Sequence, residues 1–167
     1  MEAIKVRPAR TQDINAIADL CGPLIQSRVL LGKERVELYE SVQEFVVAED
    51  SSGKVIGCGA LHVMWEDLGE VRTLAVSENH QGTGVGKSIL EALLDRARTL
   101  GLKRIFCLTF EVDFFKKTGF EPIADTPVEP AVYAELVLSN DEGIAEFLDL
   151  ARVKQNTLGN TRMLKLL

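Results

Sequence analysis

Runs of apolar residues, separated by polar turns, divide the chain into short strands and amphipathic helices. Residues 71–76 are aliphatic and β-branched, a pattern that predicts a buried strand, and the polar residues 77–81 predict a loop after it. From Lys87 to about Leu100 the apolar positions recur every three or four residues, which predicts an amphipathic helix. Gly101 is suited to cap the end of that helix. The apolar face of the helix consists of Ile89, Leu90, Leu93, Leu94 and Ala97.

Similar patterns predict the other elements of the chain. Further strands are expected at residues 3–7, 44–49, 55–64, 104–110 and 161–167, with a short one around Ile123. Helices are expected from Thr11 onward and at residues 36–42, 112–118, 131–138 and 142–150, with a short helix or turn at 24–31. Pro8 should end the first strand, and Gly22-Pro23 should stop or kink the first helix. Because strands and helices alternate without repeats or a linker, we expect one α/β domain over residues 1–167.

Composition and charge narrow the classes of partner. The chain has 167 residues, of which 46% are hydrophobic and 26% charged, as is usual for a globular protein with a real core. The formal net charge of −6 argues against nucleic acid or an anionic membrane as the main partner. The N-terminal residues form no apolar signal region, and no apolar run reaches the length of a membrane span. We therefore expect neither a nucleic acid nor a membrane as a partner.

The cysteines and histidines do not form a disulfide framework or a metal motif. Cys21, Cys58 and Cys107 all stand in apolar contexts, and their odd number and irregular spacing indicate reduced, buried thiols in a cytoplasmic protein. The sequence contains no C-x-x-C pair, and His62 and His80 are not at metal-ligand spacing. We therefore expect no metal cofactor.

A glycine-rich segment joins the predicted central strand to the long helix. Gly82, Gly84 and Gly86 alternate there with Thr83 and Val85. Closely spaced glycines let an anion approach the backbone, and the first turn of a helix offers free N–H groups to it. The segment therefore predicts a phosphate-bearing ligand, and the alternative is a glycine-rich turn without a ligand.

The spacing of these glycines excludes two common phosphate-binding fingerprints. A nucleotide-triphosphate loop, G-x-x-x-x-G-K-[ST], would need glycine at the position of Gln81. The dinucleotide fingerprint, G-x-G-x-x-G, would need glycine at the position of Lys87. What fits is Gln81-x-x-Gly84-x-Gly86 directly after a strand, which resembles the pyrophosphate-binding motif of the GNAT family of acyl-CoA-dependent N-acetyltransferases.

A second motif and the order of the elements strengthen this resemblance. The segment Phe114-Phe115-Lys116-Lys117-Thr118-Gly119-Phe120 matches a GNAT motif that follows the strand after the long helix. The order of predicted strands and helices over residues 3–124 is also that of the family. The resemblance implies a GNAT fold of the α/β (α+β) class, in which a mixed central sheet splays around the CoA site and carries helices on both faces.

The resemblance also assigns residues to acetyl-CoA, the expected co-substrate. It implies that the backbone of Leu74, Ala75 and Val76 binds the pantetheine arm in the gap between the splayed strands. It places Phe115 near the pantetheine or the acetyl group, although packing in the core is the alternative for a phenylalanine. The N–H groups that the resemblance gives to the pyrophosphate belong to Gln81, Gly82, Thr83, Gly84, Val85, Gly86 and Lys87.

Several segments narrow the resemblance to one branch of the family, the amino-acid N-acetyltransferases that acetylate glutamate. These segments are residues 30–35, 43–45, 57–61, 69–70 with 74–76, and 160–164. The resemblance implies direct transfer of acetyl from acetyl-CoA to the α-amine of L-glutamate, the first step of arginine biosynthesis. Longer members carry an amino-acid-kinase-like domain ahead of this one, so the chain matches the short, single-domain form and arginine feedback is in doubt.

The catalytic residues are expected at the head of the splayed strands. By resemblance Glu70 is the base that takes a proton from the attacking amine, and the alternative is a solvated carboxylate at a strand end. Many GNAT enzymes protonate the leaving thiolate with a tyrosine after the strand that corresponds to residues 104–110, but this region of the chain has Phe114 and Phe115 and no tyrosine. Thr109 stands in the position of a serine in related synthases, so either Thr109 or water is the expected acid.

Binding of glutamate requires cations, because the substrate carries two carboxylates. The cationic candidates are Lys33, Arg35, Arg72 and Arg162, and Arg35 is the favoured one because it lies in a matching segment. His62 stands where related synthases have a lysine, and Asn160 and Thr161 match a polar pair in the family. Each of these residues has a surface or structural role as its alternative.

Three other readings stay open at this point. The same fold acetylates other small amines and protein N-termini, and a non-catalytic acyl-CoA-binding module would keep the glycine loop. The charge pattern favours a small-molecule amino acid, because a cleft with several cations repels polyamines and basic peptides. The many apolar residues between 132 and 150 are compatible with a homodimer.

Overall fold

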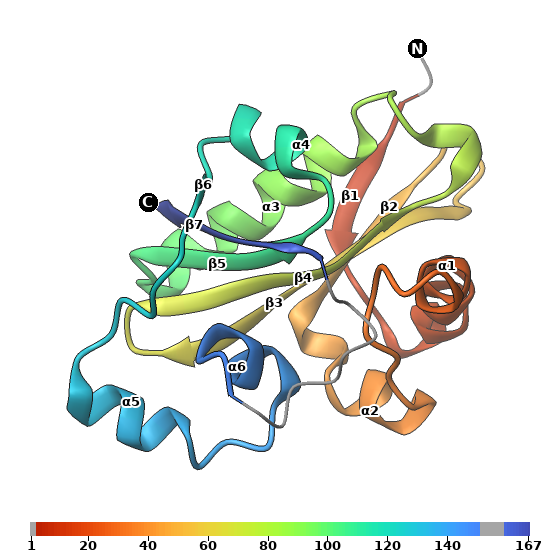
Figure 1. Cartoon of the computed structure of the whole chain (residues 1–167). Helices are drawn as coiled ribbons and strands as arrows, with labels where there is room; N and C mark the ends of the chain where they lie inside the picture. The colour runs from red at the N-terminus through yellow and green to blue at the C-terminus, as the bar shows by residue number, and fades with distance from the viewer. Residues whose placement is uncertain (1–2, 151–158) are drawn as a thin grey trace.

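A seven-stranded mixed sheet forms the centre of the molecule (Figure 1). The computed structural model describes residues 3–150 and 159–167. The strands lie in the order β1-β2-β3-β4-β5-β7-β6, and within these two ranges only β4 and β5 pair in parallel. Their bounds are β1 (Lys5–Pro8), β2 (Phe45–Glu49), β3 (Val55–Trp65), β4 (Leu68–Val76), β5 (Arg104–Thr109), β6 (Glu121–Pro122) and β7 (Thr161–Leu166).

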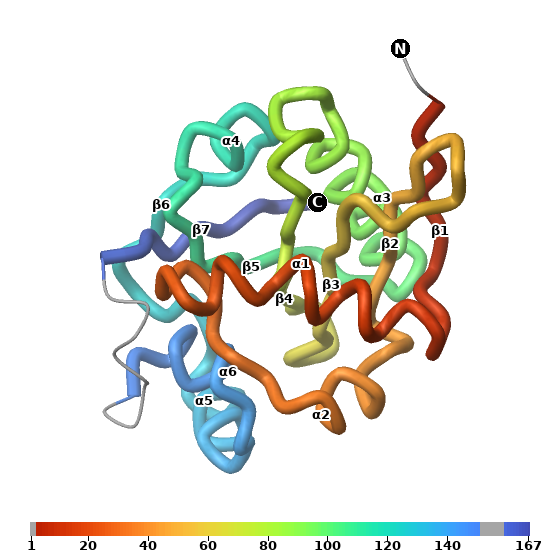
Figure 2. The backbone as a smooth tube through the Cα atoms, turned by 90° about the vertical axis from the view of Figure 1, so that its right-hand side faces the viewer, coloured from red at the N-terminus to blue at the C-terminus, as the bar shows by residue number. Residues whose placement is uncertain are grey.

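Helices cover both faces of this sheet, as the sequence predicted. They are α1 (Ile14–Gln26), α2 (Arg35–Glu40), α3 (Val85–Leu100), α4 (Val112–Lys117), α5 (Pro130–Leu136) and α6 (Glu142–Phe147). Single 3-10 turns lie at η1 (Thr11–Asp13), η2 (Val42–Glu44) and η3 (Glu78–His80). Figure 2 shows α1 crossing in front of the central strands, and Figures 1 and 2 both show α2, α5 and α6 at the lower end of the molecule.

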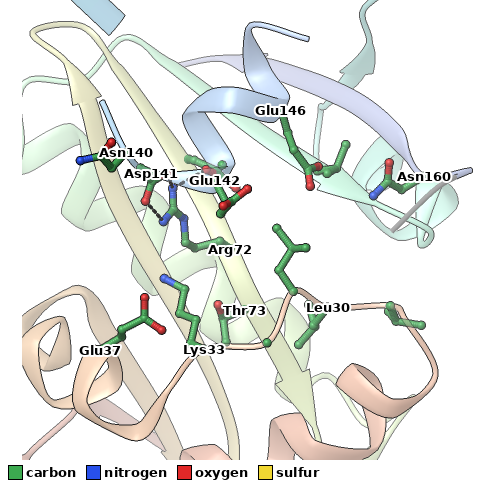
Figure 3. A pocket seen from close by; sticks show the side chains of 16 residues that line it. Leu30, Lys33, Glu37, Arg72, Thr73, Asn140, Asp141, Glu142, Glu146 and Asn160 are labelled. Atoms are coloured by element: carbon green, nitrogen blue, oxygen red, sulfur yellow. Dashed lines mark hydrogen bonds and ion pairs between the residues drawn. The ribbon is translucent and has the colours of Figure 1, made fainter. Parts of the chain in front are cut away.

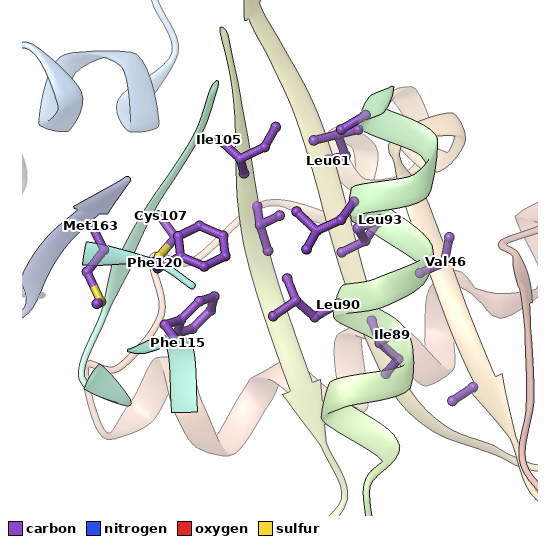
Figure 4. Packing of buried hydrophobic residues seen from close by; sticks show 14 of the residues in the cluster. Val46, Leu61, Ile89, Leu90, Leu93, Ile105, Cys107, Phe115, Phe120 and Met163 are labelled. Atoms are coloured by element: carbon purple, nitrogen blue, oxygen red, sulfur yellow. The ribbon is translucent and has the colours of Figure 1, made fainter. Parts of the chain in front are cut away.

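The alternation of side chains along the strands divides the core between the two faces. Val46 of β2 packs with Ile89, Leu90 and Leu93 of α3 in the largest cluster, which also includes Phe115 of α4 (Figure 4). On the opposite face, one cluster joins β2 and β3 to α1 and α2, and another joins β3, β4 and β5 to α5 and α6. Each helix is therefore held by the apolar stripe that its sequence provides.

The parallel pair at the centre of the sheet is short, which opens the sheet on one side. β4 and β5 pair only from Leu68, opposite Arg104, to Glu70, opposite Phe106. β4 continues to Val76 and remains paired there with β3 on its other side. Within the described residues, the second half of β4 has no strand partner on the β5 side. This divergence confirms the splayed sheet that the sequence predicted.

Prolines were expected to end two elements, and the structure bears this out for the first strand but not for the first helix. α1 does not stop at Gly22-Pro23 but continues to Gln26. Pro23 is exposed, so water can reach the backbone carbonyl to which its missing N–H would have donated. The helix is held on the sheet by buried residues such as Ile17. The first strand does end at Pro8, as predicted, with Pro8 as the last paired residue of β1. A proline is tolerated there because β1 is an edge strand.

Candidate active site

A cavity of about 230 Å³ lies at the end of the short parallel pair. Most of its lining comes from three parts of the chain: residues 29–33 after α1, the middle of β4, and residues 140–146 at the start of α6. Glu37 of α2, Leu108 of β5 and Asn160 complete it. Figure 3 shows side chains from all three parts pointing toward one space. The polar lining includes Lys33, Glu37, Glu70, Arg72, Asp141 and Asn160.

An ion network of three residues forms one wall of this cavity. Glu70 is 5% exposed, and its Oε2 accepts a hydrogen bond of 2.6 Å from Nη2 of Arg72. Arg72 also donates to both carboxylate oxygens of Asp141, from Nη1 to Oδ2 and from Nη2 to Oδ1, each at 2.7 Å (Figure 3). This is the fork geometry that an arginine forms with a carboxylate. Both terminal nitrogens of Arg72 are therefore engaged by acidic side chains.

The backbone of β4 explains why Glu70 and Arg72 lie on the same face. They stand two residues apart in a strand, so their side chains point the same way. The next residue, Thr73, has a φ of 57°, and the β3–β4 register shifts between Cys58 and Ala60 opposite it. A left-handed β-branched residue in a strand is a marked departure of the kind found at functional sites. This irregularity changes the direction of the β4 backbone next to the cavity, and Thr73 is one of the residues that line the cavity.

α6 is fixed over the network at both of its ends. Asp141 is its N-cap, and Oδ1 accepts a hydrogen bond of 3.0 Å from the backbone N of Ile144. At the other end, the ring of Phe147 packs edge-on against Phe106, with ring centroids 5.0 Å apart. The carbonyl of Phe147 accepts a hydrogen bond from the guanidinium of Arg162. The sequence after β6 thus places an acidic side chain against the middle of β4.

The charges of this network are strongly coupled. Burial alone would raise the pKa of Asp141, but the hydrogen bonds and the positive charge of Arg72 hold it well below its usual value. Burial opposes the charge of Arg72, yet the charge of Glu70 and the contacts with Asp141 raise the pKa of the guanidinium. Asp141 and Arg72 therefore stay charged at neutral pH.

A glycine brings the backbone of α6 close to the same pair. A Cβ built on Gly143 would overlap Oε2 of Glu70 and would lie 2.6 Å from Nη2 of Arg72. No larger residue fits unless these two side chains move. The first turn of α6 therefore packs directly on the ion pair of β4.

The start of α3 has the geometry that the glycine motif predicted. Gly82 and Gly84 have φ values of 73° and 92°, and Gly84 is the N-cap of α3. A Cβ on either glycine would meet no atom of the described chain within 4 Å, so the backbone is open to a ligand. The first-turn N–H groups of a 16-residue helix face that opening, which suits a pyrophosphate. Gln81 donates from Nε2 to the carbonyl of Val76 at 3.3 Å, which ties this loop to the end of β4.

The remaining residues predicted for CoA flank this opening. Leu74, Ala75 and Val76 lie in the part of β4 that has no β5 partner among the described residues, so backbone groups are available for a pantetheine arm. Lys87 is exposed, and its Nζ lies 3.7 Å from Oε1 of Glu91, one turn further along α3. Phe115 is buried in the core between Phe114 and Phe120, with edge-on ring contacts at 5.1 Å.

The structure brings some of the predicted substrate residues together and places the others elsewhere. Lys33, Arg72 and Asn160 line the cavity with Glu70. Arg35 does not: it is exposed and donates to Oδ1 of Asn15 on α1. Lys33 forms no hydrogen bond or ion pair with another residue in the described ranges. It is therefore the cation of the lining that is available to a carboxylate.

Three other predicted residues lie around the cavity without lining it. Arg162 binds the carbonyl of Phe147 behind α6, and its guanidinium lies 6.0 Å from the ring centre of Phe106. Thr161 pairs with Thr109 across β5 and β7. His62 is hydrogen-bonded to Glu44, and its Nε2 lies 3.6 Å from Oδ2 of Asp141.

The side chain of Thr109, the predicted acid, also lies outside the cavity lining. It is 8% exposed, and its Oγ1 accepts a hydrogen bond of 2.8 Å from the backbone N of Glu111. An oxygen that accepts from the backbone still has its own proton to donate. The role of Thr109 as the acid stays a prediction.

Sequence reasoning missed Asp141, Gly143 and Thr73. The N-cap role of Asp141 could have been predicted, because an Asp directly ahead of a predicted helix is a common N-cap. Its contact with Arg72 spans 69 positions and has no local signal. The left-handed turn at Thr73 occurs within a run that otherwise reads as a regular strand, so nothing in the pattern indicates it.

The cysteines do not supply a nucleophile to the cavity. Cys21, Cys58 and Cys107 are all buried, and none lines the cavity. Burial and the nearby charge of Glu70 raise the pKa of the Cys107 thiol well above its usual value. Within the described ranges, no cluster of histidine, cysteine and acidic residues is arranged to hold a metal ion. The helices described there are also too short or too polar to cross a bilayer.

Comparison with known proteins adds independent findings. Residues 20–120 match the model of the acetyltransferase (GNAT) family. The chain is 54% identical over 164 residues to an amino-acid acetyltransferase of Mycobacterium tuberculosis, covering 97% of this chain and 94% of that protein. A crystal structure of a Mycobacterium tuberculosis protein with CoA and NLQ superposes with a TM-score of 0.93 at 53% identity, covering 98% of this chain and 99% of that one.

A longer relative shares the same fold at lower identity. N-acetylglutamate synthase from Neisseria gonorrhoeae, solved with coenzyme A and N-acetyl-glutamate, superposes with a TM-score of 0.78 at 26% identity. The alignment covers 99% of this chain but only 35% of the Neisseria protein. The cavity beside β4 is thus part of a fold that binds CoA in both solved relatives.

Proposed function

Because the chain belongs to the acetyltransferase (GNAT) family and is an acetyl-CoA-dependent amino-acid N-acetyltransferase, we propose that its acceptor is the α-amine of L-glutamate. The observation that carries this proposal is that Glu70 and Lys33 line the same cavity. A free amino acid presents an ammonium group and a carboxylate, and these two side chains offer the complementary charges.

The geometry supports direct transfer in a ternary complex. The open backbone of β4 after Glu70 would hold the pantetheine, and the start of α3 would hold the pyrophosphate. The acetyl thioester would then lie near the cavity, where Glu70 takes the proton that the amine loses on attack. The C–S bond breaks as the new C–N bond forms, and the CoA thiolate leaves with a proton from Thr109 or from water. With every cysteine buried, no acetyl-enzyme is part of this proposal.

L-Glutamine is the second candidate acceptor, and the state of Arg72 favours it. Both terminal nitrogens of Arg72 are taken by Glu70 and Asp141, so this arginine is not free for a substrate carboxylate. Lys33 then remains for the α-carboxylate. A side-chain amide needs no second cation and would lie against Asn160, which also lines the cavity.

The relatives support a glutamate-like acceptor. The Neisseria protein is named as the synthase of N-acetylglutamate and was solved with that compound. We further propose that the reaction belongs at the entry to arginine biosynthesis, as the resemblance to the glutamate N-acetyltransferases implies. A cytoplasmic location is proposed from the buried, reduced cysteines. Other small amines and protein N-termini are the competing acceptors, and the absence of any turnover would indicate a non-catalytic acyl-CoA-binding module.

A comparison of Lys33→Gln with Lys54→Gln tests the proposed placement of the substrate. Lys33 lines the cavity, whereas Lys54 is exposed in the β2–β3 hairpin. Loss of one charge-assisted bond is worth roughly 1.5–3 kcal/mol, so Lys33→Gln should raise KM for the amino acid by about one to two orders of magnitude. KM for acetyl-CoA should stay unchanged, and Lys54→Gln should alter neither constant. An unchanged amino-acid KM in Lys33→Gln would contradict the placement.

A further inference from the structure

We propose that Asp141 is a positioning residue for acetyl transfer, which holds Arg72 in the orientation that fixes the carboxylate of Glu70 toward the acceptor amine. The inference rests on the proposed function of the cavity, in which Glu70 is the base. It does not depend on which amino acid is the acceptor.

The first step of the argument is the shared guanidinium nitrogen. Nη2 of Arg72 donates to Oδ1 of Asp141 at 2.7 Å and to Oε2 of Glu70 at 2.6 Å. The second nitrogen, Nη1, donates to Oδ2 of Asp141 at 2.7 Å. A bidentate contact fixes the plane of a guanidinium, whereas a single contact leaves it free to turn. Asp141 therefore determines where Arg72 directs the bond that Glu70 receives.

The second step is the cost of removing that contact. The side chain of Arg72 is only 10% exposed, and its Nε has no hydrogen-bond partner among the described residues. Without Asp141, Nη1 would lose the carboxylate it contacts, and a buried charged donor is costly to leave unpaired. The guanidinium would then turn toward other acceptors or toward a substrate carboxylate. Either movement would pull Glu70 out of place.

The third step is the balance of charge around Glu70. A carboxylate paired with an arginine alone carries no net charge and attracts an ammonium group only weakly. Asp141 brings a second negative charge to the same arginine, so the three side chains carry one net negative charge. The ammonium group of the acceptor would therefore meet a net negative charge at Glu70, although Glu70 remains in contact with Arg72.

The fourth step is the fit of α6 to this arrangement. Asp141 and Gly143 lie two residues apart at the start of α6, and the backbone of Gly143 packs against the Glu70–Arg72 pair. The ring contact of Phe147 with Phe106 holds the far end of the helix on β5. In this position of α6, Asp141 binds Arg72, and Gly143 has no side chain that would displace Arg72 or Glu70.

The competing explanation is that Asp141 only caps α6, since its Oδ1 also accepts from the backbone of Ile144. Two substitutions separate these roles. Asp141→Asn and Asp141→Ser both keep a good N-cap, but both remove the charge that binds Arg72. Asp95→Asn is the matched control, because Asp95 is 79% exposed and pairs with Arg98 on the surface of α3 at 2.9 Å.

The experiment measures kcat, both KM values and the melting temperature of each variant, with the best amino-acid acceptor of the unmodified enzyme. Misplacement of a reacting group by about 1 Å can cost about 10²-fold in rate, so we expect kcat to fall about 10- to 100-fold in both Asp141 variants. KM for acetyl-CoA and for the amino acid should stay within about threefold, because a positioning residue contacts neither substrate. Asp95→Asn should behave like the unmodified enzyme.

Three outcomes would overturn the proposal. A rise in the amino-acid KM with unchanged kcat would make Asp141 a direct substrate ligand. Unchanged kinetics would leave the residue without a role in the reaction. A large drop in melting temperature with loss of CoA affinity in both variants would make it structural only. Failure of the proposed function is separate, because the unmodified enzyme would then not acetylate L-glutamate, whereas the variants are tested with the best amino-acid acceptor that the unmodified enzyme has.

Discussion

The backbone of Gly143 and the carboxylate of Glu70 are in such close contact that any side chain at position 143 would displace the proposed base. A Cβ on Gly143 would lie 3.0 Å from Cδ of Glu70 and would overlap its Oε2. The two residues belong to α6 and β4, which lie far apart in the sequence. Position 143 therefore allows the geometry of the site to be changed without altering any charge.

Gly143→Ala should lower kcat while the protein stays folded. The atoms that the new methyl group meets are the ends of two side chains, Glu70 and Arg72, so the pair can move while the backbone stays in place. We expect a loss of about 10²-fold in kcat, the cost of a reacting group misplaced by about 1 Å. Steady-state kinetics and a thermal melt measure both effects.

Gly22→Ala is the control for this prediction. Gly22 lies within α1, and a Cβ there would meet no described atom within 4 Å. Alanine is a better helix former than glycine by about 1 kcal/mol, so the control should retain full activity and melt no earlier. Equal activity of the two variants would contradict the close contact at Gly143.

Glu70→Gln tests the proton acceptor. Glutamine keeps the shape of the side chain but cannot take a proton, so we expect turnover to fall by about 10²–10⁴. The loss should shrink as pH rises, because more of the acceptor amine is then already neutral. Acetyl-CoA affinity, measured by calorimetry, should hardly change.

Glu66→Gln is the matched change at an exposed position in the β3–β4 turn, and it should have no effect. A loss of turnover in Glu70→Gln that does not vary with pH would show that Glu70 positions groups rather than accepting a proton.

Gly84→Val should abolish binding of acetyl-CoA. Gly84 has a φ of 92° at the N-cap of α3, and the space beside it is empty of described protein atoms. A branched side chain would occupy the place expected for the pyrophosphate. Calorimetric titration with acetyl-CoA measures the effect.

Gly53→Val is the control for strain. Gly53 has a φ of 84° in the β2–β3 hairpin, and its surroundings are equally open. Each substitution carries a left-handed penalty of about 1–2 kcal/mol, so the two variants should lose similar stability. If Gly84→Val bound acetyl-CoA as tightly as Gly53→Val, the assignment of the loop would be wrong.

The fold could be predicted from the sequence because its signals are local. The glycine motif around Gly84 predicted where β4 is followed by α3, and helical periodicity predicted the buried face of α3. The start of that helix lies at Val85, two residues before the predicted Lys87, because the left-handed Gly84 already serves as its cap. The end of α1 was predicted wrongly at Pro23, because an exposed proline is tolerated in a helix that is otherwise well packed.

The substrate site could be predicted only in part, because its contacts are long-range. Glu70 was identified by family resemblance and Lys33 as a candidate cation for a substrate carboxylate, and the structure brings both to one cavity. The favoured Arg35 lies in the same segment as Lys33, yet the first turn of α2 directs it to Asn15. No sequence pattern indicates that Arg72 is already bound by Asp141, because that contact depends on where α6 packs.

A separate prediction concerns acid stability at the N-terminal end of the sheet. Asp13 is 5% exposed and accepts hydrogen bonds of 2.8 and 3.0 Å from Arg7, which lower its pKa below the ordinary 3.8. A carboxyl with a depressed pKa stabilises the folded state above its unfolded pKa, and this contribution is lost as pH falls through the folded value. Asp13→Asn should therefore cost roughly 1.5–3 kcal/mol of unfolding free energy at pH 7.

The difference between Asp13→Asn and the unmodified protein should shrink as pH falls below about 4, the region in which an unperturbed Asp binds its proton. Urea unfolding at pH 7 and pH 3 measures this difference. Asp19→Asn, an exposed position on α1, is the control and should have little effect at either pH. An equal loss at both pH values would contradict the ion pair as the source of stability.

The most direct test of the proposed function compares acceptors at equal concentration. Purified protein is incubated with acetyl-CoA and, separately, L-glutamate, L-glutamine, the other amino acids, spermidine or a peptide with a free N-terminus. Release of CoA thiol gives the rate, and mass spectrometry identifies the acetylated product. We predict N-acetylation of L-glutamate, with L-glutamine as the second acceptor, at rates at least about tenfold above those of spermidine and the peptide. Faster acetylation of spermidine or the peptide, or binding of acetyl-CoA without any acetylated product, would contradict the proposal.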